Sequence, residues 1–335
     1  MSRRAPLDVA VIGAGMAGLS CAVALQQAGL RVTVFDKSCG PAGRMSTRRG
    51  EGWECDHGAQ YFTARDPEFR AEVARWEAMG AAASWNPRLR VYGGTREAAR
   101  AADVARWVGM PRMTAPAALL AKTLALARGV TVVGLEREHE RGLERGHDGE
   151  RWRLLLDKAD GDSFDAVVLA LPAPQAAPLL AALAPGLSAL ADSAVMQACW
   201  TVMLQFDAPL SLPLDAAFIN GGPLRWIARN NSKPGRAGFD TWVLHASAEW
   251  SGEHLEDDAA RVAQTMIAAF CDLGGAQPQG FAVHRWRHAM ARPALDVACA
   301  WDAQQHLGLC GDWLNHGTVE GAWLSGRALA RAMTA

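Results

Sequence analysis

The run Val9-Ala10-Val11-Ile12-Gly13-Ala14-Gly15-Met16-Ala17-Gly18 constrains the fold more than any other stretch of the chain. Its apolar start predicts a buried parallel strand, and the residues that follow predict a helix through Gln27 that stops at Gly29. A second strand over 31–35 leads into Asp36. The three glycines are spaced G-x-G-x-x-G between strand and helix, so the sequence predicts a βαβ nucleotide-binding unit.

Each glycine of this turn has a separate mechanical role. Gly13 permits the tight turn, Gly15 lets the backbone approach a pyrophosphate, and Gly18 lets the helix pack closely on the strand. The helix start at Met16 and Ala17 offers unpaired N–H groups and the positive end of the helix dipole to phosphate charge. We therefore expect these five residues to bind the cofactor.

Asp36 follows Gly18 by eighteen residues, where a carboxylate can accept hydrogen bonds from a ribose diol. It would repel a 2′-phosphate, so the adenosine bound here belongs to FAD or NAD rather than NADP. The alternative interpretation is a secretory signal or membrane anchor, because Arg3 and Arg4 precede an uncharged stretch over 9–25. That stretch is shorter than the roughly 20 apolar residues of a spanning helix, and three glycines are a poor signal core.

Composition narrows the class of protein further. A chain of 335 residues is long enough for two domains, and its net charge of −1 favours neither nucleic acid nor an anionic membrane. Seven cysteines without a C-x-x-C pair predict a reduced, cytoplasmic protein. His284 and His288 have no matching cysteine or carboxylate, so no metal site is predicted.

A second glycine-rich loop, 40–45, follows Asp36 and Lys37 and ends in Gly43-Arg44-Met45. It resembles the flavoprotein signature of the amine oxidase, phytoene desaturase and protoporphyrinogen oxidase group, with Ala42 in place of the usual first glycine. The resemblance implies that Arg44 clamps the pyrophosphate of FAD through a charge-assisted contact.

The run Asp56-His57-Gly58-Ala59-Gln60-Tyr61-Phe62-Thr63-Ala64-Arg65 resembles, more narrowly, the bacterial renalases. Further matching segments lie at 226–230, 244–246, 284–286 and 319–323, so the resemblance covers essentially the whole chain. It implies that Gly58, Ala59 and Gln60 lie at the isoalloxazine ring.

Near the C-terminus, a strand over 306–310 ends in Gly311-Asp312, and a last helix opens at 318–326. The resemblance implies that Asp312 binds the ribityl or pyrophosphate region. It also implies that the helix start at Glu320, Gly321 and Ala322 faces the flavin N1–C2=O edge, where reduced flavin carries negative charge. In related flavoproteins, backbone equivalent to Val132 and Val133 meets the adenine.

The remaining segments are expected as follows. Asp66 and Pro67 start a helix that ends at Gly80, and Phe69, Val73 and Trp76 form its apolar stripe. Residues 81–104 are irregular, and 136–150 form a solvated charged loop. The sequence further predicts a helix over 114–128, a strand over 130–135, a hairpin of 152–156 with 164–171, strands near 197–206, 224–229, 241–247 and 281–288, and an apolar helical stripe within 253–273.

The predicted fold class is α/β, a Rossmann-type FAD-binding domain with an inserted β-rich α+β substrate domain. Residues 1–80, 105–172 and 291–335 are assigned to the FAD-binding domain. Residues 81–104 and 173–290 are assigned to the substrate domain, which forms a lid over the flavin.

The renalase resemblance implies an FAD-dependent oxidase of dihydronicotinamide dinucleotides reduced at ring position 2, or 6, rather than 4. Hydride passes to flavin N5, NAD(P)⁺ leaves, and O₂ is reduced to H₂O₂. A flavin amine oxidase or desaturase of the same fold is the first alternative. However, Thr318 stands where monoamine oxidases carry a caging tyrosine, and the chain has only Tyr61 and Tyr92. A non-catalytic flavin-binding protein is the second alternative.

The predicted substrate pocket is flat and aromatic, with Gln60, Tyr61, His245 and Trp286 as candidate catalytic residues. Gln60 or His245 can hydrogen-bond a nicotinamide carboxamide, although either could instead be a satisfied core group. No cysteine lies beside the final motif, so FAD is expected to be noncovalent. The expected partners are a dihydronicotinamide dinucleotide as substrate and O₂. Neither nucleic acid nor a membrane is expected as a partner, and a monomer is favoured.

Overall fold

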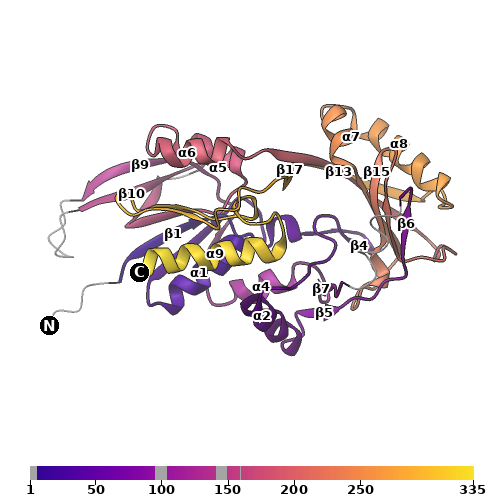
Figure 1. Cartoon of the computed structure of the whole chain (residues 1–335), viewed down its shortest axis with the longest axis horizontal. Helices are drawn as coiled ribbons and strands as arrows, with labels where there is room; N and C mark the ends of the chain where they lie inside the picture. Colours follow the sequence, from indigo (N-terminus) through magenta and orange to yellow (C-terminus); the bar gives the residue numbers. More distant parts are fainter. Residues whose placement is uncertain (1–5, 95–103, 141–148, 159) are drawn as a thin grey trace. The chain divides into compact units, whose positions relative to one another are not determined.

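The computed structural model of the chain describes residues 6–94, 104–140, 149–158 and 160–335 (Figure 1). These residues form two compact units, each of which is described by itself. The first unit comprises the chain up to residue 43 together with 117–196 and 291–335. The second unit comprises 44–116 and 197–290, so both are discontinuous in sequence.

The first unit is built on a Rossmann-type sheet with the strand order β18-β19-β12-β1-β2-β8. All neighbours pair in parallel except β18 and β19, which are antiparallel. The central β1 is buried from Val9 to Ile12 because it has a strand on each side. The strand bounds are β18 (Ala300–Asp302), β19 (Leu307–Leu309), β12 (Ala166–Leu169), β1 (Asp8–Ile12), β2 (Arg31–Asp36) and β8 (Ala125–Arg128).

Two helices of this unit lie side by side, α1 (Met16–Gln27) and α9 (Val319–Thr334), as Figure 1 shows in indigo and yellow. Ser20 Oγ donates a hydrogen bond to the Trp323 carbonyl at 2.8 Å. A Cβ built on Gly326 would lie 2.2 Å from the Ala17 carbonyl oxygen, so the two helices can approach this closely only because residue 326 is a glycine. The first and last cofactor motifs of the sequence are thus joined directly.

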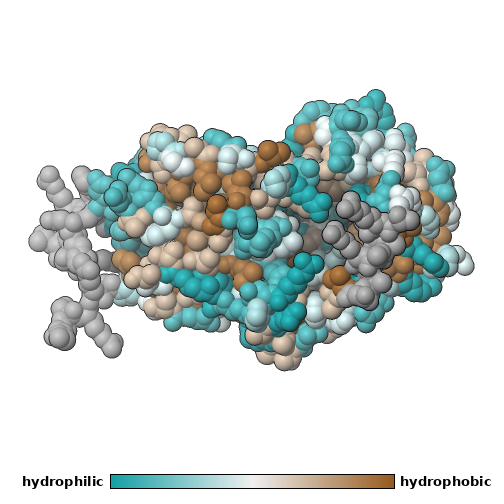
Figure 2. Space-filling view, in the orientation of Figure 1, coloured by the Kyte–Doolittle hydropathy of each residue, from teal (hydrophilic) through white to brown (hydrophobic). Residues whose placement is uncertain are grey.

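A smaller sheet of order β11-β10-β9 completes the strands described for this unit, together with helices α5 and α6. Ala173 and Leu180 of α5 pack in the same core as Leu169 of β12. Figure 2 shows tan to brown, apolar residues over these two helices. The bounds are β9 (Val132–Glu140), β10 (Gly149–Leu156), β11 (Asp160–Phe164), α5 (Ala173–Leu180) and α6 (Pro185–Asp192).

The second unit is built on a sheet of order β17-β13-β16-β15-β14-β6, and α8 covers one of its faces. Alternate strand residues such as Val202, Ile227 and Leu244 pack against Val262 and Met266 of α8. The residues between them must point to the opposite face. The bounds are β17 (Gly280–Ala291), β13 (Met196–Phe206), β16 (Asp240–Ala246), β15 (Leu224–Arg229), β14 (Ala216–Ile219), β6 (Leu89–Tyr92), α7 (Ala248–Glu253) and α8 (Ala259–Asp272).

Helix α2 (Pro67–Ala78) of the second unit confirms the helix predicted from its sequence. The Asp66 side chain accepts from the backbone N–H groups of Glu68 and Phe69, as an N-cap does. The predicted stripe of Phe69, Val73 and Trp76 is buried. The other short elements are β3 (Thr47–Gly50), β4 (Trp53–Asp56), β5 (Ala82–Ser84), β7 (Trp107–Gly109), α4 (Ala115–Ala121), and the 3₁₀ turns Gly43–Met45, Asn230–Ser232 and Asp312–Leu314.

Four predicted elements are wrong in part. The helix expected over 114–128 ends at Ala121, and 125–128 form β8, because its backbone completes the sheet beside β2. The hairpin partner of β10 ends at Phe164, since 166–169 pair with β1 instead. Part of the expected charged loop, 136–140, extends β9, whereas 141–148 lie outside the described residues. Strands β5 and β6 interrupt the region expected to be irregular, of which 95–103 is not described.

The boundaries of the two units also differ from the predicted domain boundaries. Residues 44–80 and 105–116 belong to the second unit, because Asp56 and Gly109 bond to side chains of the 230–236 loop. Residues 173–196 belong to the first unit, where α5 and α6 share the core of the Rossmann-type sheet. In the described part of the chain, every helix is too short or too polar to cross a membrane.

Candidate functional site

The glycine-rich turn after β1 has the geometry of a phosphate cradle. Gly13 has φ +111°, and its Cβ would lie 2.5 Å from the Ala170 carbonyl oxygen. A Cβ on Gly18 would lie 2.0 Å from the Gly13 oxygen, so both positions exclude a side chain. At Gly15, which caps α1, a Cβ would meet nothing within 4 Å. The turn is tight where the protein packs and open beside the helix N-terminus, which fits a pyrophosphate.

The carboxylate of Asp36 lies at the end of β2 and organises this turn. One oxygen accepts from the Ala14 N–H at 2.7 Å, and the other accepts from the Ser38 N–H at 2.7 Å. Each carboxylate oxygen can accept a further bond, so a ribose diol can still be bound. Lys37 and Gly43 follow, and a Cβ on Gly43 would lie 3.4 Å from Gly15 Cα.

A second group of residues that the sequence predicts to bind FAD lies in the first unit, near the start of α9. Thr318 caps the helix by accepting from the Gly321 N–H at 2.9 Å. A Cβ on Gly321 would lie 1.8 Å from the Asn315 carbonyl oxygen, so this position requires glycine. The buried Asp312 accepts through its backbone carbonyl from the N–H groups of Asn315 and Gly317.

At the start of β9, Val132 is buried whereas Val133 is 56 % exposed. An exposed valine offers an apolar surface to a flat ring such as adenine. The open cradle at Gly15, the Asp36 carboxylate and the start of α9, which Thr318 caps, together fit the shape and charge of FAD. The structure brings into this unit Gly13, Gly15, Met16, Ala17, Gly18, Asp36, Lys37, Gly43, Val132, Val133, Gly311, Asp312, Glu320, Gly321 and Ala322.

The second unit holds the other predicted site residues, beginning with the loop that follows β4. The Ala59 N–H donates to the Arg44 carbonyl at 2.8 Å, and a Cβ on Gly58 would lie 1.9 Å from that oxygen. Gly58 therefore permits a close backbone approach. The Arg44 guanidinium donates to the Ala289 carbonyl at 3.0 Å, and Met45 is buried.

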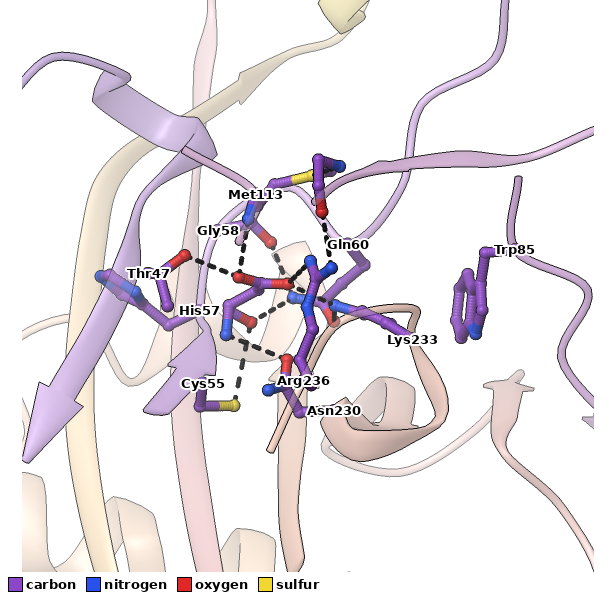
Figure 3. A network of polar contacts seen from close by, with 12 residues as sticks. Thr47, Cys55, His57, Gly58, Gln60, Trp85, Met113, Asn230, Lys233 and Arg236 are labelled. Carbon is purple, nitrogen blue, oxygen red and sulfur yellow. Dashed lines mark hydrogen bonds and ion pairs between the residues drawn. The ribbon is translucent and has the colours of Figure 1, made fainter. Parts of the chain in front are cut away.

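Asp56, just before this loop, lies in a buried network of donors (Figure 3). Its Oδ1 accepts from Thr47 Oγ1 at 2.6 Å and from the Met113 N–H at 3.1 Å. Its Oδ2 accepts from Lys233 Nζ at 3.2 Å and from Arg236 Nη2 at 2.5 Å. The side chains of all three charged residues are at most 1 % exposed.

Electrostatics within this network keep Asp56 ionised. Burial alone would raise the pKa of the Asp56 carboxyl, but Lys233 and Arg236 outweigh it and hold that pKa below its usual range. Burial lowers the pKa of Lys233 more than Asp56 raises it. Burial also raises the pKa of the neighbouring Cys55 thiol to about 12, so the thiol is neutral. One carboxylate therefore faces two buried cations.

The network also fixes Gln60. The Gln60 Nε2 group donates to the Asp56 carbonyl at 2.6 Å and to the Gly58 carbonyl at 3.0 Å. Its Oε1 accepts from Lys233 Nζ at 3.1 Å. Both N–H donors of the carboxamide are thus used inside the protein, and Gln60 acts as a positioning group for the loop.

On the sheet, one face carries the aromatic side chains of the candidate site. Phe218, Trp226 and His245 lie directly opposite one another on β14, β15 and β16. They alternate with the residues packed on α8, and so does Trp286 on β17. We call these four residues the aromatic face.

Two members of the aromatic face hold the site loop. His245 Nε2 lies 3.1 Å from the His57 carbonyl, and Trp286 Nε1 donates to the same oxygen at 3.0 Å. Because a carbonyl can only accept, His245 is protonated at Nε2. The His57 and Trp286 rings stack with centroids 5.1 Å apart, and His284 packs edge-on against His57 at 4.9 Å.

The histidines of this cluster are neutral. Burial lowers the pKa of His245 to about 4, and it lowers that of His57 to about 3 with help from His284 and Arg48. In the described residues, the buried His57 Nδ1 has no hydrogen-bond partner. The cluster of His57, His245, His284 and Trp286 is therefore uncharged and aromatic, and it holds a polar atom that a ligand could satisfy.

Tyr61 lies apart from His57, among other aromatic rings. Its ring centroid is 5.6 Å from that of Trp226 and 6.2 Å from that of Trp85, and the Arg106 guanidinium lies 5.3 Å over its face. The second unit thus holds the predicted Arg44, Met45, Gly58, Ala59, Gln60, Tyr61, His245 and Trp286.

Sequence reasoning missed the roles of Lys233 and Arg236. They occur in the polar run Asn230-Asn231-Ser232-Lys233-Pro234-Gly235-Arg236, which has the composition of an exposed turn. The run adopts a turn, yet the Lys233 side chain is fully buried against Asp56. His57 was missed as well, although it lies between Asp56 and Gly58.

Comparison with known proteins places the chain in a class. The family model for NAD(P)-binding Rossmann-like domains matches residues 11–76. The model for flavin containing amine oxidoreductases matches residues 69–334, most of the chain. The chain therefore belongs to the flavin containing amine oxidoreductase family. Its predicted fold class, its FAD cofactor and its nature as a flavoprotein oxidoreductase are confirmed at this level.

Similar proteins share part of the sequence or the whole fold. An L-amino-acid oxidase of Bungarus fasciatus is 41 % identical over 73 residues, which are 21 % of this chain and 14 % of the oxidase. A hydroxyneurosporene desaturase of Rubrivivax gelatinosus is 36 % identical over 107 residues, 28 % of this chain and 20 % of the desaturase. The chain thus matches a fifth or less of the length of these two curated relatives.

Two solved structures resemble the chain over its full length. A protein assigned as a protoporphyrinogen oxidase from Exiguobacterium sp. 255-15 has a TM-score of 0.72 at 13 % identity and covers 100 % of this chain, which covers 99 % of that protein. Wild-type putrescine oxidase bound to putrescine has a TM-score of 0.68 at 14 % identity, with coverage of 98 % and 99 %. At these identities the likeness shows the fold.

Proposed function

We propose that this chain oxidises dihydronicotinamide dinucleotides that are reduced at ring position 2 or 6 instead of 4. The overall reaction takes dihydro-NAD(P), O₂ and a proton to NAD(P)⁺ and H₂O₂. Bound FAD, held without a covalent link, supplies the acceptor for the hydride and the reductant for O₂. The protein's own task is to bind the dinucleotide and orient its nicotinamide ring.

In this proposal, residues of the first unit bind FAD. The N–H groups at the start of α1 and the open space at Gly15 take the pyrophosphate, and Asp36 takes the adenosine ribose. The start of α9 at Gly321 offers N–H groups to a flavin edge that becomes negative on reduction. In the second unit, we assign Arg44, Met45, Gly58, Ala59 and Gln60 to the same cofactor.

The main support for the proposed substrate is the neutral, aromatic character of the cluster that His57, His245, His284 and Trp286 form in the second unit. Burial lowers the pKa values of His57 and His245 far below neutrality, so neither is an imidazolium that could act as a general acid at pH 7. The misplaced dihydronicotinamide isomers are already strong hydride donors and need orientation more than acid–base help. The rings of Trp286 and Tyr61 offer flat surfaces suited to a planar heterocycle.

An amine oxidase is the second candidate, and family membership favours it. Amine recognition in this fold uses a cage of aromatic rings, and the position before the last helix is filled here by Thr318. The Thr318 side chain caps α9 instead of presenting a ring. We therefore rank this candidate below the dinucleotide oxidase.

Oxygen uptake by the purified yellow protein tests the proposal. We expect rapid uptake with 2-dihydro- or 6-dihydro-NAD, and H₂O₂ formed in equal amount to NAD⁺. The ordinary 4-dihydro isomer and simple primary amines serve as controls and should give slow uptake. Faster uptake with an amine than with any dinucleotide would overturn the proposal in favour of the amine oxidase.

A further inference from the structure

The aromatic face offers ring surfaces, but most of its polar groups are already committed to the protein. Gln60 uses both of its N–H donors on backbone carbonyls. His245 Nε2 and Trp286 Nε1 both bond to the His57 carbonyl. None of these three donors is left to recognise a carboxamide oxygen.

Trp226 carries a further donor on the same face of the sheet. It lies directly opposite His245 across β15 and β16, and only 5 % of its surface is exposed. In the described residues its buried Nε1 has no hydrogen-bond partner. Leaving such a donor unsatisfied costs roughly 1–3 kcal/mol, so an acceptor from a ligand would be favoured there.

The neighbours of Trp226 narrow the chemistry of that ligand. Its ring centroid is 4.7 Å from that of Phe218 and 5.6 Å from that of Tyr61. These ring surfaces suit a flat group, and a trapped water would need about two to four polar partners. The Arg106 guanidinium is directed to the face of Tyr61. A planar heteroaromatic ring that carries a neutral acceptor oxygen satisfies these conditions.

We propose that Trp226 Nε1 donates the hydrogen bond that recognises the carboxamide oxygen of the nicotinamide ring. Trp226 is then a specificity-determining residue for the dinucleotide, on the same face as His245. This inference rests on the proposed function, and it names the side chain that recognises the nicotinamide ring of the proposed substrate. It assigns to Trp226 the hydrogen bond that the sequence analysis predicted from Gln60 or His245.

Trp85 is a matched control for Trp226. It is a second buried tryptophan of the same ring cluster, with its centroid 6.5 Å from that of Trp226. Unlike Trp226, it has a partner, because its Nε1 donates to Ser232 Oγ at 3.3 Å. Replacing either tryptophan by phenylalanine keeps an aromatic ring and removes one indole N–H.

The test measures binding of two probes to the FAD-loaded protein by calorimetry. One probe is NAD⁺, and the other is the same dinucleotide without the 3-carboxamide. We expect Trp226→Phe to weaken NAD⁺ binding about tenfold, the value of one hydrogen bond, and to leave the second probe unchanged. Trp85→Phe should change neither. Trp226→His, which retains a ring N–H, should recover part of the lost affinity.

A second readout separates recognition from structure. Both variants lose the same buried ring volume, but only Trp85→Phe also loses a hydrogen bond. Without dinucleotide, Trp226→Phe should therefore have a higher thermal midpoint than Trp85→Phe. Wild-type affinity of Trp226→Phe for NAD⁺ would overturn the inference and leave the proposed function standing. If the wild type binds neither probe, the proposed function fails and the inference fails with it.

Discussion

At the scale of single residues, the ion group of Asp56, Lys233 and Arg236 in the second unit is almost completely buried. Removing charged groups from water is expensive, and the group is retained because Asp56 binds four donors at once. It ties the loop that carries Gly58 to the 230–236 turn. We interpret it as the device that holds the site loop in place.

Asp56→Asn should therefore destabilise the protein by about 3–5 kcal/mol, because it leaves Lys233 and Arg236 buried without a counter-charge. Urea unfolding at pH 7 measures this loss. Glu256→Gln is the control, since Glu256 pairs with Arg285 and Arg287 but is 69 % exposed, and should cost far less stability than Asp56→Asn. Equal, small losses in both variants would refute the role given to Asp56.

The neutral histidines predict a dependence of stability on pH. Burial lowers the pKa of His245 to about 4 from the ordinary 6.5, so between these values the unfolded chain binds a proton that the folded chain does not. Stability must then fall as the pH drops from 6.5 to 4, by about 3 kcal/mol from His245 alone. His57, whose pKa burial lowers to about 3, adds a loss of the same sign.

Urea unfolding of the wild type and His245→Asn at several pH values between 7 and 4 checks this. The variant lacks the titrating group, so its stability should fall less steeply over the same range. Identical slopes in the two proteins would show that His245 is not buried in neutral form.

At the scale of elements, the glycines of the turn between β1 and α1 have different roles: Gly18 is needed for packing, and Gly15 is proposed to leave space for the pyrophosphate. A Cβ at Gly18 would collide with the Gly13 carbonyl, whereas a Cβ at Gly15 would enter open space beside the helix start. Gly15→Ala should leave the thermal midpoint of the FAD-free protein unchanged but weaken FAD binding. Gly18→Ala should instead lower stability itself, by about 1–3 kcal/mol.

Thermal unfolding of the FAD-free proteins and flavin titration of both variants measure the two effects separately. If Gly15→Ala binds FAD with wild-type affinity, the proposal that the pyrophosphate binds at this turn is wrong.

The same turn shows how far the sequence can lead. The strand, the helix and Asp36 were predictable because their signals are local: an apolar run, glycine spacing and a carboxylate at a fixed distance. Strand β8 was not, since Ala-rich residues 125–128 carry no helix-breaking signal before Gly129. Its pairing with β2 determines the structure there.

The candidate site was predictable to a different degree. Trp286 and His245 could be predicted on a common face because strand alternation is regular. The partners of Asp56 could not, because Lys233 and Arg236 lie about 180 residues away in a polar turn. No local pattern reveals that such a lysine is buried, or that the Gln60 carboxamide oxygen accepts a hydrogen bond from it.

At the scale of the whole molecule, the proposed function combines a cofactor-binding unit with a substrate-binding unit. Family membership gives the protein a flavin cofactor, which we propose binds to the Rossmann-type unit, and the second unit supplies a neutral, aromatic cluster. The central claim is therefore about which hydride donor reduces the flavin.

Anaerobic rapid mixing of the FAD-loaded protein with each candidate donor tests that claim most directly. The account predicts that 2-dihydro- or 6-dihydro-NAD bleaches the visible flavin absorbance within a single turnover and leaves NAD⁺, whereas 4-dihydro-NAD and primary amines bleach it slowly. Subsequent acid denaturation should release the flavin into solution, as a noncovalent cofactor requires. Rapid bleaching by an amine, with none by the misplaced dihydronicotinamide isomers, would contradict the account.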